Sequence, residues 1–184
     1  MHHNVKAPFD REAAKSFKAG DTVSLSGTIY TARDAAHKKL IELIDQNKEL
    51  PFNITNQTIY YVGPCPNREG EVIGSAGPTT SYRMDAYAPR LIELGQTGMI
   101  GKGLRGDPVI DAMKRFGSVY FGAIGGAGAL MAQCIKSQEI IAFPELGAEA
   151  VRRLEVENLP LTVIIDSYGN NLYETGKAQY RKCK

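Results

Sequence analysis

Apolar segments alternate along the chain with turns rich in glycine and proline, and these segments show two different periods. Continuous or alternating runs of apolar and β-branched residues are typical of strands, whereas a spacing of three to four residues is typical of helices. The first pattern predicts strands over residues 23–30, 57–63, 71–77, 98–103, 118–124 and 161–173, the last folded by a Tyr-Gly-Asn-Asn turn. The second pattern predicts helices over residues 31–46, 81–94, 109–117, 129–137 and 148–157.

Individual residues mark where these helices begin or break. Thr31 is followed three positions later by Asp34, which is the spacing of a capping box, so we expect Thr31 to be an N-cap. Asp107 and Pro108 are expected to be the cap and the first-turn proline of the next long helix. Pro89 is expected to kink or restart the helix that contains it, because proline cannot donate a backbone hydrogen bond.

The succession of elements predicts one layered α/β domain over residues 1–184, with a flexible tail from about residue 174 to residue 184. Hairpin-like turns interrupt the alternation of strand and helix, so the sheet should be mixed rather than purely parallel. A length of 184 residues with 43% apolar and 23% charged residues is ordinary for one globular domain.

Charge and hydropathy argue against two kinds of partner. A net charge of +2 lacks the basic excess of nucleic-acid-binding proteins, so we expect no nucleic acid. Residues 116–135 carry no charge over the length of a membrane span, but their glycines would each weaken a helix by roughly 0.8–1 kcal/mol. We therefore predict a strand, a glycine turn and a buried helix there, and no membrane segment. Residues 1–10 contain no apolar run typical of a signal peptide, so we expect a cytoplasmic protein.

The three cysteines, Cys65, Cys134 and Cys183, lie far apart in the sequence, and no C-x-x-C motif occurs. Free, reduced thiols are the simplest interpretation, and they fit the cytoplasm. An iron–sulfur cluster normally takes at least three thiolates brought together in space. We therefore expect no metal or cluster to be bound by this chain alone.

The turn TARDAAH places Arg33 and His37 four residues apart at the start of a predicted helix. The helix dipole disfavours positive charge at this end, and an external anion would relieve that conflict. The alternative is that Arg33 pairs with a carboxylate elsewhere and His37 is a hydrogen-bonded helix residue.

Two further turns carry hydroxyl groups or cations where strands lead into helices, which is where open α/β sheets usually bind ligands. In GPTTSYRM, a helix that starts after Thr79 or Thr80 would offer free N–H groups to an anion, with Arg83 as a second donor. The alternative is simple helix capping beside a surface arginine. In IGKG, Lys102 is flanked by glycines that leave its ammonium free to reach a ligand, although a solvated turn lysine is the commoner case.

The ordered series SGTIYTARDAAHKKL, YYVGP, SAGPTTSYRM, GMIGKG, AIGGAGAL and PELGAEAVRRLEVENLPLTVIIDSYGN resembles the β subunit of class I, iron–sulfur-dependent fumarate hydratase. It is similar in the same way to the β subunit of L-tartrate dehydratase. The resemblance runs from about residue 5 to residue 173. It implies a three-layer β/β/α fold called a swivelling domain, and an enzyme of the hydro-lyase class.

The resemblance also implies a partner and a set of site residues. A separate α subunit, in a heterodimer or heterotetramer, would carry the [4Fe–4S] cluster, and this chain would be inactive without it. Thr79 would be the catalytic base, and His37 a candidate proton relay. The substrate, a C4 dicarboxylate, would be bound by Arg33, Arg83, Lys102 and Thr80.

The expected reaction is the reversible hydration of fumarate to L-malate, a step of the tricarboxylic acid cycle. One alternative is the dehydration of L-tartrate to oxaloacetate, because both substrates are four-carbon dicarboxylates that need the same cations. A second alternative, from another class, is a non-catalytic anion-binding module.

Overall fold

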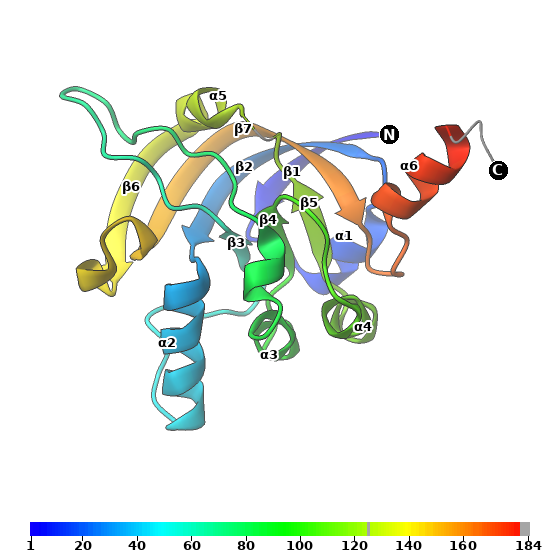
Figure 1. Cartoon of the computed structure of the whole chain (residues 1–184), viewed down its shortest axis with the longest axis horizontal. Helices are drawn as coiled ribbons and strands as arrows, with labels where there is room; N and C mark the ends of the chain where they lie inside the picture. Colours follow the sequence, from blue (N-terminus) through cyan, green and yellow to red (C-terminus); the bar gives the residue numbers. More distant parts are fainter. Residues whose placement is uncertain (125, 181–184) are drawn as a thin grey trace.

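In the computed structural model, which describes residues 1–124 and 126–180, seven strands form one curved sheet (Figure 1). Its order is β1-β2-β3-β4-β5-β7-β6, and β2 also pairs with β7. The bounds are β1 His2–Ala7, β2 Thr22–Thr31, β3 Thr58–Tyr60, β4 Gly98–Gly101, β5 Val119–Gly122, β6 Ile135–Ala142 and β7 Val151–Ile165. The strands β1 to β5 pair in parallel, whereas β7 is antiparallel to β2, β5 and β6, so the predicted mixed sheet is confirmed.

The helices gather mainly on one side of this sheet, where α2, α3 and α4 lie together (Figure 1). The α-helices are α1 Arg11–Ser16, α2 Asp34–Asp45, α3 Ala88–Glu93, α4 Asp107–Phe116, α5 Gly128–Gln133 and α6 Leu172–Tyr180. Two 3₁₀ segments, η1 Ser81–Met84 and η2 Pro144–Glu149, complete the described elements.

Alternating side chains along the central strands separate two hydrophobic cores. In and just after β3, Ile59 and Tyr61 belong to the core shared with the helices, whereas Tyr60 belongs to the core shared with β2 and β7. In β4, Met99 and Ile100 divide in the same way. A strand with both faces buried lies between two layers. The domain therefore has the expected α/β architecture. The strands β3–β5 lie between the helices on one face and the strands β2 and β7 of the same curved sheet on the other.

The longest difference from the predicted elements is at residues 148–157, where we expected a helix and the structure has the start of strand β7. Charged residues with good helix propensity alternate there with buried Val151, Leu154 and Val156. The strand is fixed by pairing with β2 and β6, and cross-strand pairs such as Arg153 with Glu139 satisfy the charges. Tertiary pairing has overridden local propensity.

Three other predicted elements differ from the structure. In the segment 161–173, β7 ends at Ile165 and helix α6 begins at Leu172, so the chain after the turn is not a strand, although Ile165 and Asn171 form an isolated bridge. Residues 71–77 were expected to be a strand, but no strand is assigned to this described segment. The helix expected over 129–137 ends at Gln133, because residues from Ile135 onward pair with β7 as strand β6. The predicted break at Pro89 is confirmed, since Pro89 lies in the first turn of α3, after η1 has ended.

The predicted helix caps were displaced by a few residues. Thr31 is the last residue of β2, and its buried hydroxyl donates to the Ala150 carbonyl and accepts from the Arg152 N–H, so it is not an N-cap. Asp107 is the first residue of α4 rather than its cap, a position that the helix dipole also favours for an acid. In the predicted tail, residues up to Tyr180 form helix α6, while residues 181–184 lie outside the described part. The flexibility of this end stays a prediction.

Gly101, at the end of β4, gives a test of how closely the turn that contains Ser81 packs on this strand. A Cβ at Gly101 would overlap the buried Ser81 hydroxyl and lie 3.0 Å from the Tyr61 ring. We expect Gly101→Ala to lower the free energy of unfolding by roughly 1–3 kcal/mol, the usual cost of overpacking. Urea unfolding measures it.

Gly176→Ala is the matched control, because a Cβ at Gly176 in α6 meets no described atom within 4 Å. Its stability should stay equal or rise by up to about 1 kcal/mol, since alanine favours helix over glycine. Equal stabilities for the two variants would contradict the tight packing of the turn on β4.

Candidate functional site

Three turns that are distant in sequence meet where the parallel strands β2, β3 and β4 end. The Thr79 N–H donates to the carbonyl of Tyr61, just after β3, at 2.8 Å. The Ser81 N–H donates to the Lys102 carbonyl at 2.9 Å, and Thr80 forms a parallel bridge with Lys102. Parallel strands place their carboxyl ends at one edge of a sheet. The segment containing Thr79 and Thr80 therefore lies alongside the residue that carries the candidate lysine.

Arg33 and Arg83 are linked through the carboxylate of Asp34. Arg83 donates from Nη2 to Asp34 Oδ2 at 2.7 Å, and Arg33 Nη2 lies 3.7 Å from Asp34 Oδ1. Arg33 Nη2 is also 3.0 Å from Glu149 Oε1. Glu149 Oε2 in turn accepts from the Ala35 N–H at 3.2 Å, at the start of α2. The alternative that Arg33 pairs with a carboxylate elsewhere is thus observed, and the same contacts bring the two arginines together.

The turn 77–84 differs from the predicted helix mouth. Ser81–Met84 is a single 3₁₀ turn rather than the start of a longer helix, and Thr80 caps it without a side-chain hydrogen bond. The Ser81 N–H is used by the Lys102 carbonyl, so the prediction that this N–H is free for an anion was wrong. Thr80 and Lys102 have exposed side chains, and Thr79 is partly exposed. The hydroxyls and the ammonium, not the backbone N–H of Ser81, are available to a ligand.

His37 is fully buried in α2, behind the arginines. Its Nδ1 lies 2.9 Å from the Arg33 carbonyl, which can only accept, so Nδ1 carries the proton. Burial is the largest cause that lowers the pKa of His37 to about 4, and the charge of Arg105 lowers it further. His37 is therefore a neutral imidazole at pH 7, and burial is the main cause.

The other ring nitrogen of His37 is also buried. Within residues 1–124 and 126–180, Nε2 has no hydrogen-bond partner, and the ring packs edge-on against Tyr61 at 5.4 Å between centroids. The alternative that His37 is a hydrogen-bonded helix residue is observed. Its role as a proton relay stays a prediction.

The acidic residues that hold these cations and one buried arginine were not predicted from the sequence. Asp34 is part of the TARD motif itself, so its position beside Arg33 could have been noticed. Glu149 comes from η2, and no local signal connects it to Arg33. Arg105 follows Lys102 by three residues and is buried against Asp85, with 2.7 Å between Nε and Oδ1.

Gly128, in the glycine-rich segment 125–129, lies beside Gly77 at the start of the threonine turn. Gly125 is outside the described residues. A Cβ at Gly128 would overlap the Ser75 hydroxyl and lie 2.9 Å from the Gly77 nitrogen. The Ala76 N–H donates to the Gly128 carbonyl at 3.0 Å. Close packing against Ser75 and Gly77 accounts for Gly128.

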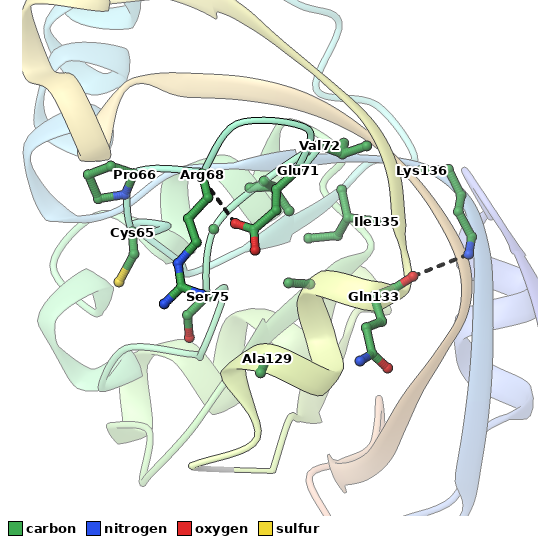
Figure 2. Close-up of a pocket in the computed structure, with 13 residues that line it drawn as sticks. Cys65, Pro66, Arg68, Glu71, Val72, Ser75, Ala129, Gln133, Ile135 and Lys136 are labelled. Carbon is green, nitrogen blue, oxygen red and sulfur yellow. Dashed lines mark hydrogen bonds between the residues drawn. The ribbon is translucent and has the colours of Figure 1, made fainter.

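A hollow of about 770 Å³ opens between the loop 65–75 and the segment that joins α5 to β6 (Figure 2). Its walls include the side chains of Arg68, Glu71, Ile135 and Lys136. The Arg68 N–H donates to the Glu71 carboxylate, and Lys136 donates to the Gln133 carbonyl. None of the six candidate residues is among its described lining residues, so this hollow is separate from the three turns.

Two features are absent from residues 1–124 and 126–180. No helix there is long and apolar enough to cross a membrane. No group of three His, Cys, Asp or Glu side chains there could hold a metal ion.

Comparison with known proteins gives a consistent result. Residues 2–176 match the sequence model of a family described as Fumarase C-terminus. Fumarate hydratase 2 of Leishmania major is 41% identical over 174 residues, which are 92% of this chain and 31% of that protein. The aerobic class I fumarate hydratase of Escherichia coli K12 is 45% identical over 154 residues, 83% of this chain and 28% of that protein. A Methanocaldococcus jannaschii protein named "Putative L(+)-tartrate dehydratase subunit beta" is 41% identical over 179 residues, 94% of this chain and 92% of that protein.

The chain belongs to the Fumarase C-terminus family, since the family match covers most of its length. This confirms the resemblance found in the motifs. The chain spans less than a third of the length of the fumarate hydratases that it matches, but almost the full length of the Methanocaldococcus protein. Both names denote enzymes of the hydro-lyase class.

The depressed pKa of His37 predicts a specific loss of stability in acid. The unfolded chain binds a proton at this histidine below its ordinary pKa of 6.5, whereas the folded chain does so only near pH 4. The contribution of neutral His37 to the free energy of unfolding is therefore fully present above pH 6.5. It is lost as the pH falls toward 4, and the loss is on the order of 3 kcal/mol. Urea unfolding at pH 7, 5.5 and 4.5 measures the decline.

His37→Gln should show a shallower decline than wild type, because Gln does not titrate in this range. His2→Gln, at an exposed histidine, is the control and should follow the wild-type curve. Parallel curves for wild type and His37→Gln would contradict the burial of a neutral imidazole.

Proposed function

We propose that this chain is the substrate-binding and proton-transferring part of a [4Fe–4S] hydro-lyase that converts fumarate reversibly to L-malate together with a cysteine-bearing α subunit. The observation that carries the proposal is the meeting of the TARD, GPTTSYR and IGKG turns at the ends of β2, β3 and β4. These turns contribute Arg33, Arg83 and Lys102, enough positive charge for a small dianion. Family membership supports the reaction class.

The proposed steps on this chain concern binding and one proton. Arg33, Arg83 and Lys102, with the Thr80 hydroxyl, bind the two carboxylates and fix the orientation of the substrate, which removes part of the entropic barrier. Thr79 Oγ1 takes the proton from the carbon next to the one that bears the hydroxyl. A threonine alkoxide is a strong base and needs nearby positive charge, which these cations supply. In hydration, Thr79 returns the proton to the same carbon.

The described residues of this chain do not fit a cluster site. Cys65 is exposed and Cys134 is partly buried, and neither belongs to a described group of three potential metal ligands. The cluster is therefore assigned to the partner, where it would act as a Lewis acid on the leaving hydroxyl. The two free thiols also agree with a reducing compartment such as the cytoplasm.

The surface around the three turns supports a partner subunit. Exposed apolar side chains follow the ends of β4 and β5 and the start of η1, namely Tyr82, Leu104 and Ile124, with Leu130 nearby on α5. Apolar side chains gathered around a polar site are typical of a surface that is covered by another protein. A partner seated there would enclose the substrate and exclude water. The subunit name of the Methanocaldococcus relative supports a heterodimer or heterotetramer.

Two other functions remain as alternatives. The L-tartrate dehydratase reaction, which yields oxaloacetate, is favoured by the same relative, because this chain covers nearly all of that subunit. A non-catalytic anion-binding module is favoured by the exposure of Lys102 and Arg83 in the isolated chain. The module would bind dicarboxylates tightly without a partner, whereas a half-site would bind them weakly.

The choice between the two reactions can be tested with the reconstituted complex of this chain and its α subunit. We expect kcat/KM for malate to exceed that for L-tartrate, and the isolated chain to be inactive. Steady-state assays on both substrates, with cluster content determined for each preparation, measure this. A larger kcat/KM for tartrate would replace fumarate hydration with tartrate dehydration, and tight dicarboxylate binding by the isolated chain would favour the module.

Substitution of Thr79 distinguishes a catalytic role of this residue from a structural one. Thr79→Ala should lower kcat at least hundredfold, the usual contribution of a general base, with a much smaller change in KM. Arg83→Lys should raise KM as well as lower kcat, because lysine keeps the charge but loses the planar fork. Both effects are measured in folded complexes of equal cluster content.

Thr175→Ala in α6 is the control, since Thr175 bonds only locally, to the Asn171 carbonyl, among the described hydrogen bonds. Its kinetics should equal those of wild type. A loss of kcat below about tenfold in Thr79→Ala would return Thr79 to a structural role.

A further inference from the structure

A fully buried guanidinium, that of Arg105, lies directly behind the candidate site. Its Nε donates to Asp85 Oδ1 at 2.7 Å, and its side chain has no exposed surface. The guanidinium carbon lies 5.3 Å from the centre of the Tyr61 ring and 5.1 Å from that of Tyr120. Arg105 therefore occupies an aromatic cage closed by one carboxylate.

The two partners in this ion pair belong to two of the three turns that carry the proposed site, the threonine turn and the lysine turn. Arg105 follows Lys102 by three residues, and Asp85 follows Arg83 by two. The second oxygen of Asp85 accepts from the Gly106 N–H at 2.6 Å. A single carboxylate thus holds both the side chain and the backbone of the lysine turn against the end of η1.

The walls of the cage fix the same two turns. The Tyr120 hydroxyl lies 2.9 Å from Ser81 Oγ and donates to the Gly103 carbonyl at 3.0 Å. Tyr61 accepts the Thr79 N–H at its carbonyl. The cage residues Tyr61 and Tyr120 therefore contact the backbone N–H of Thr79, the side chain of Ser81 and the backbone carbonyl of Gly103, just after Lys102.

Burying a charge here is expensive unless it is well paired. Within residues 1–124 and 126–180, Nη2 of Arg105 has no hydrogen-bond partner, so the pairing is incomplete. A buried ion pair often contributes little net stability compared with apolar residues of similar size. Stability alone gives a weak reason for this arginine, whereas its Nε contact with Asp85 joins the two turns.

We propose that Arg105 is a positioning residue that, through Asp85, holds the threonine–arginine turn 79–83 and the lysine turn 101–104 in fixed register before substrate arrives. The consequence for catalysis rests on the proposed function, but the effect on the turns does not. Arg105 does not touch the substrate and acts through Arg83 and Lys102.

The effect on the turns is measured first, by amide hydrogen exchange in the chain without a partner. In Arg105→Met, exchange at Ser81 and Gly106, whose N–H groups bond across the two turns, should accelerate at least tenfold relative to wild type. Arg105→Lys should give an intermediate acceleration, because the charge remains and the fork is lost. Arg153→Met, which breaks an exposed ion pair with Glu139, is the matched control and should leave both amides unchanged.

The effect on substrate binding is measured second, in complexes with matched folded fraction and cluster content. Arg105→Lys should raise KM at least tenfold while kcat falls less than fivefold, since the threonine base is retained. Arg105→Met combined with Asp85→Asn should raise KM no more than Arg105→Met alone, because the two residues act as one contact. An arginine that only stabilised the fold would lower the melting temperature and leave KM unchanged.

The outcomes separate this inference from the proposed function. Exchange at Ser81 and Gly106 within twofold of wild type in folded Arg105→Met would overturn the positioning role, whatever the activity. An unchanged KM in Arg105→Lys would overturn the predicted consequence of this positioning for substrate binding. A wild-type complex inactive on both substrates would refute the proposed function, while accelerated exchange would still establish that Arg105 holds the two turns.

Discussion

The close approach of the turn 77–84 to the end of β4 is the contact on which the site depends. Gly101 leaves no room for a side chain beside Ser81, and the Ser81 N–H bonds to the Lys102 carbonyl. These contacts extend the parallel pairing of β3 and β4 by one further bridge, from Thr80 to Lys102. Because the turn continues the sheet, the positions of Thr79 and Arg83 are fixed by the same pairing that builds the core.

The layering of the domain explains why the chemistry gathers at this edge. Both faces of β3 and β4 are covered, one by the strands β2 and β7 and the other by helices, and neither strand carries a charged side chain. The charged side chains collect in the turns after the strands, where the backbone can still reach water. Parallel pairing of β2, β3 and β4 then brings three such turns to one edge, although they lie far apart in the sequence.

The strands and motifs that are local in the sequence were predictable, and the contacts that depend on long-range pairing were not. The strands β2 and β4 appear in the sequence as short runs rich in apolar residues. The TARD and GPTTSYR turns appear as short polar motifs that follow apolar segments. The first half of β7 was predicted to be a helix, because Arg152, Arg153 and Glu155 have helical propensity and the partner strand β2 lies far away in the sequence. Glu149 reaches Arg33 only because β6 and β7 carry η2 to the start of α2. Arg105 could not be predicted, since its burial depends on packing against Tyr61, Asp85 and Tyr120, which come from separate parts of the chain.

The two arginines are held with unequal strength, and this bears on how a dianion would enter. Arg83 pairs with Asp34 where both side chains are substantially exposed, and such pairs are typically worth only about 0–1 kcal/mol. Glu149 is more buried, and its carboxylate also accepts the Ala35 N–H at the start of α2, where the helix dipole favours an anion. An incoming carboxylate would therefore displace Asp34 from Arg83 at little cost, while Glu149 keeps Arg33 in place. In the proposed reaction, Arg33 then acts as a fixed anchor, and Arg83 as the cation that exchanges an internal carboxylate for that of the substrate.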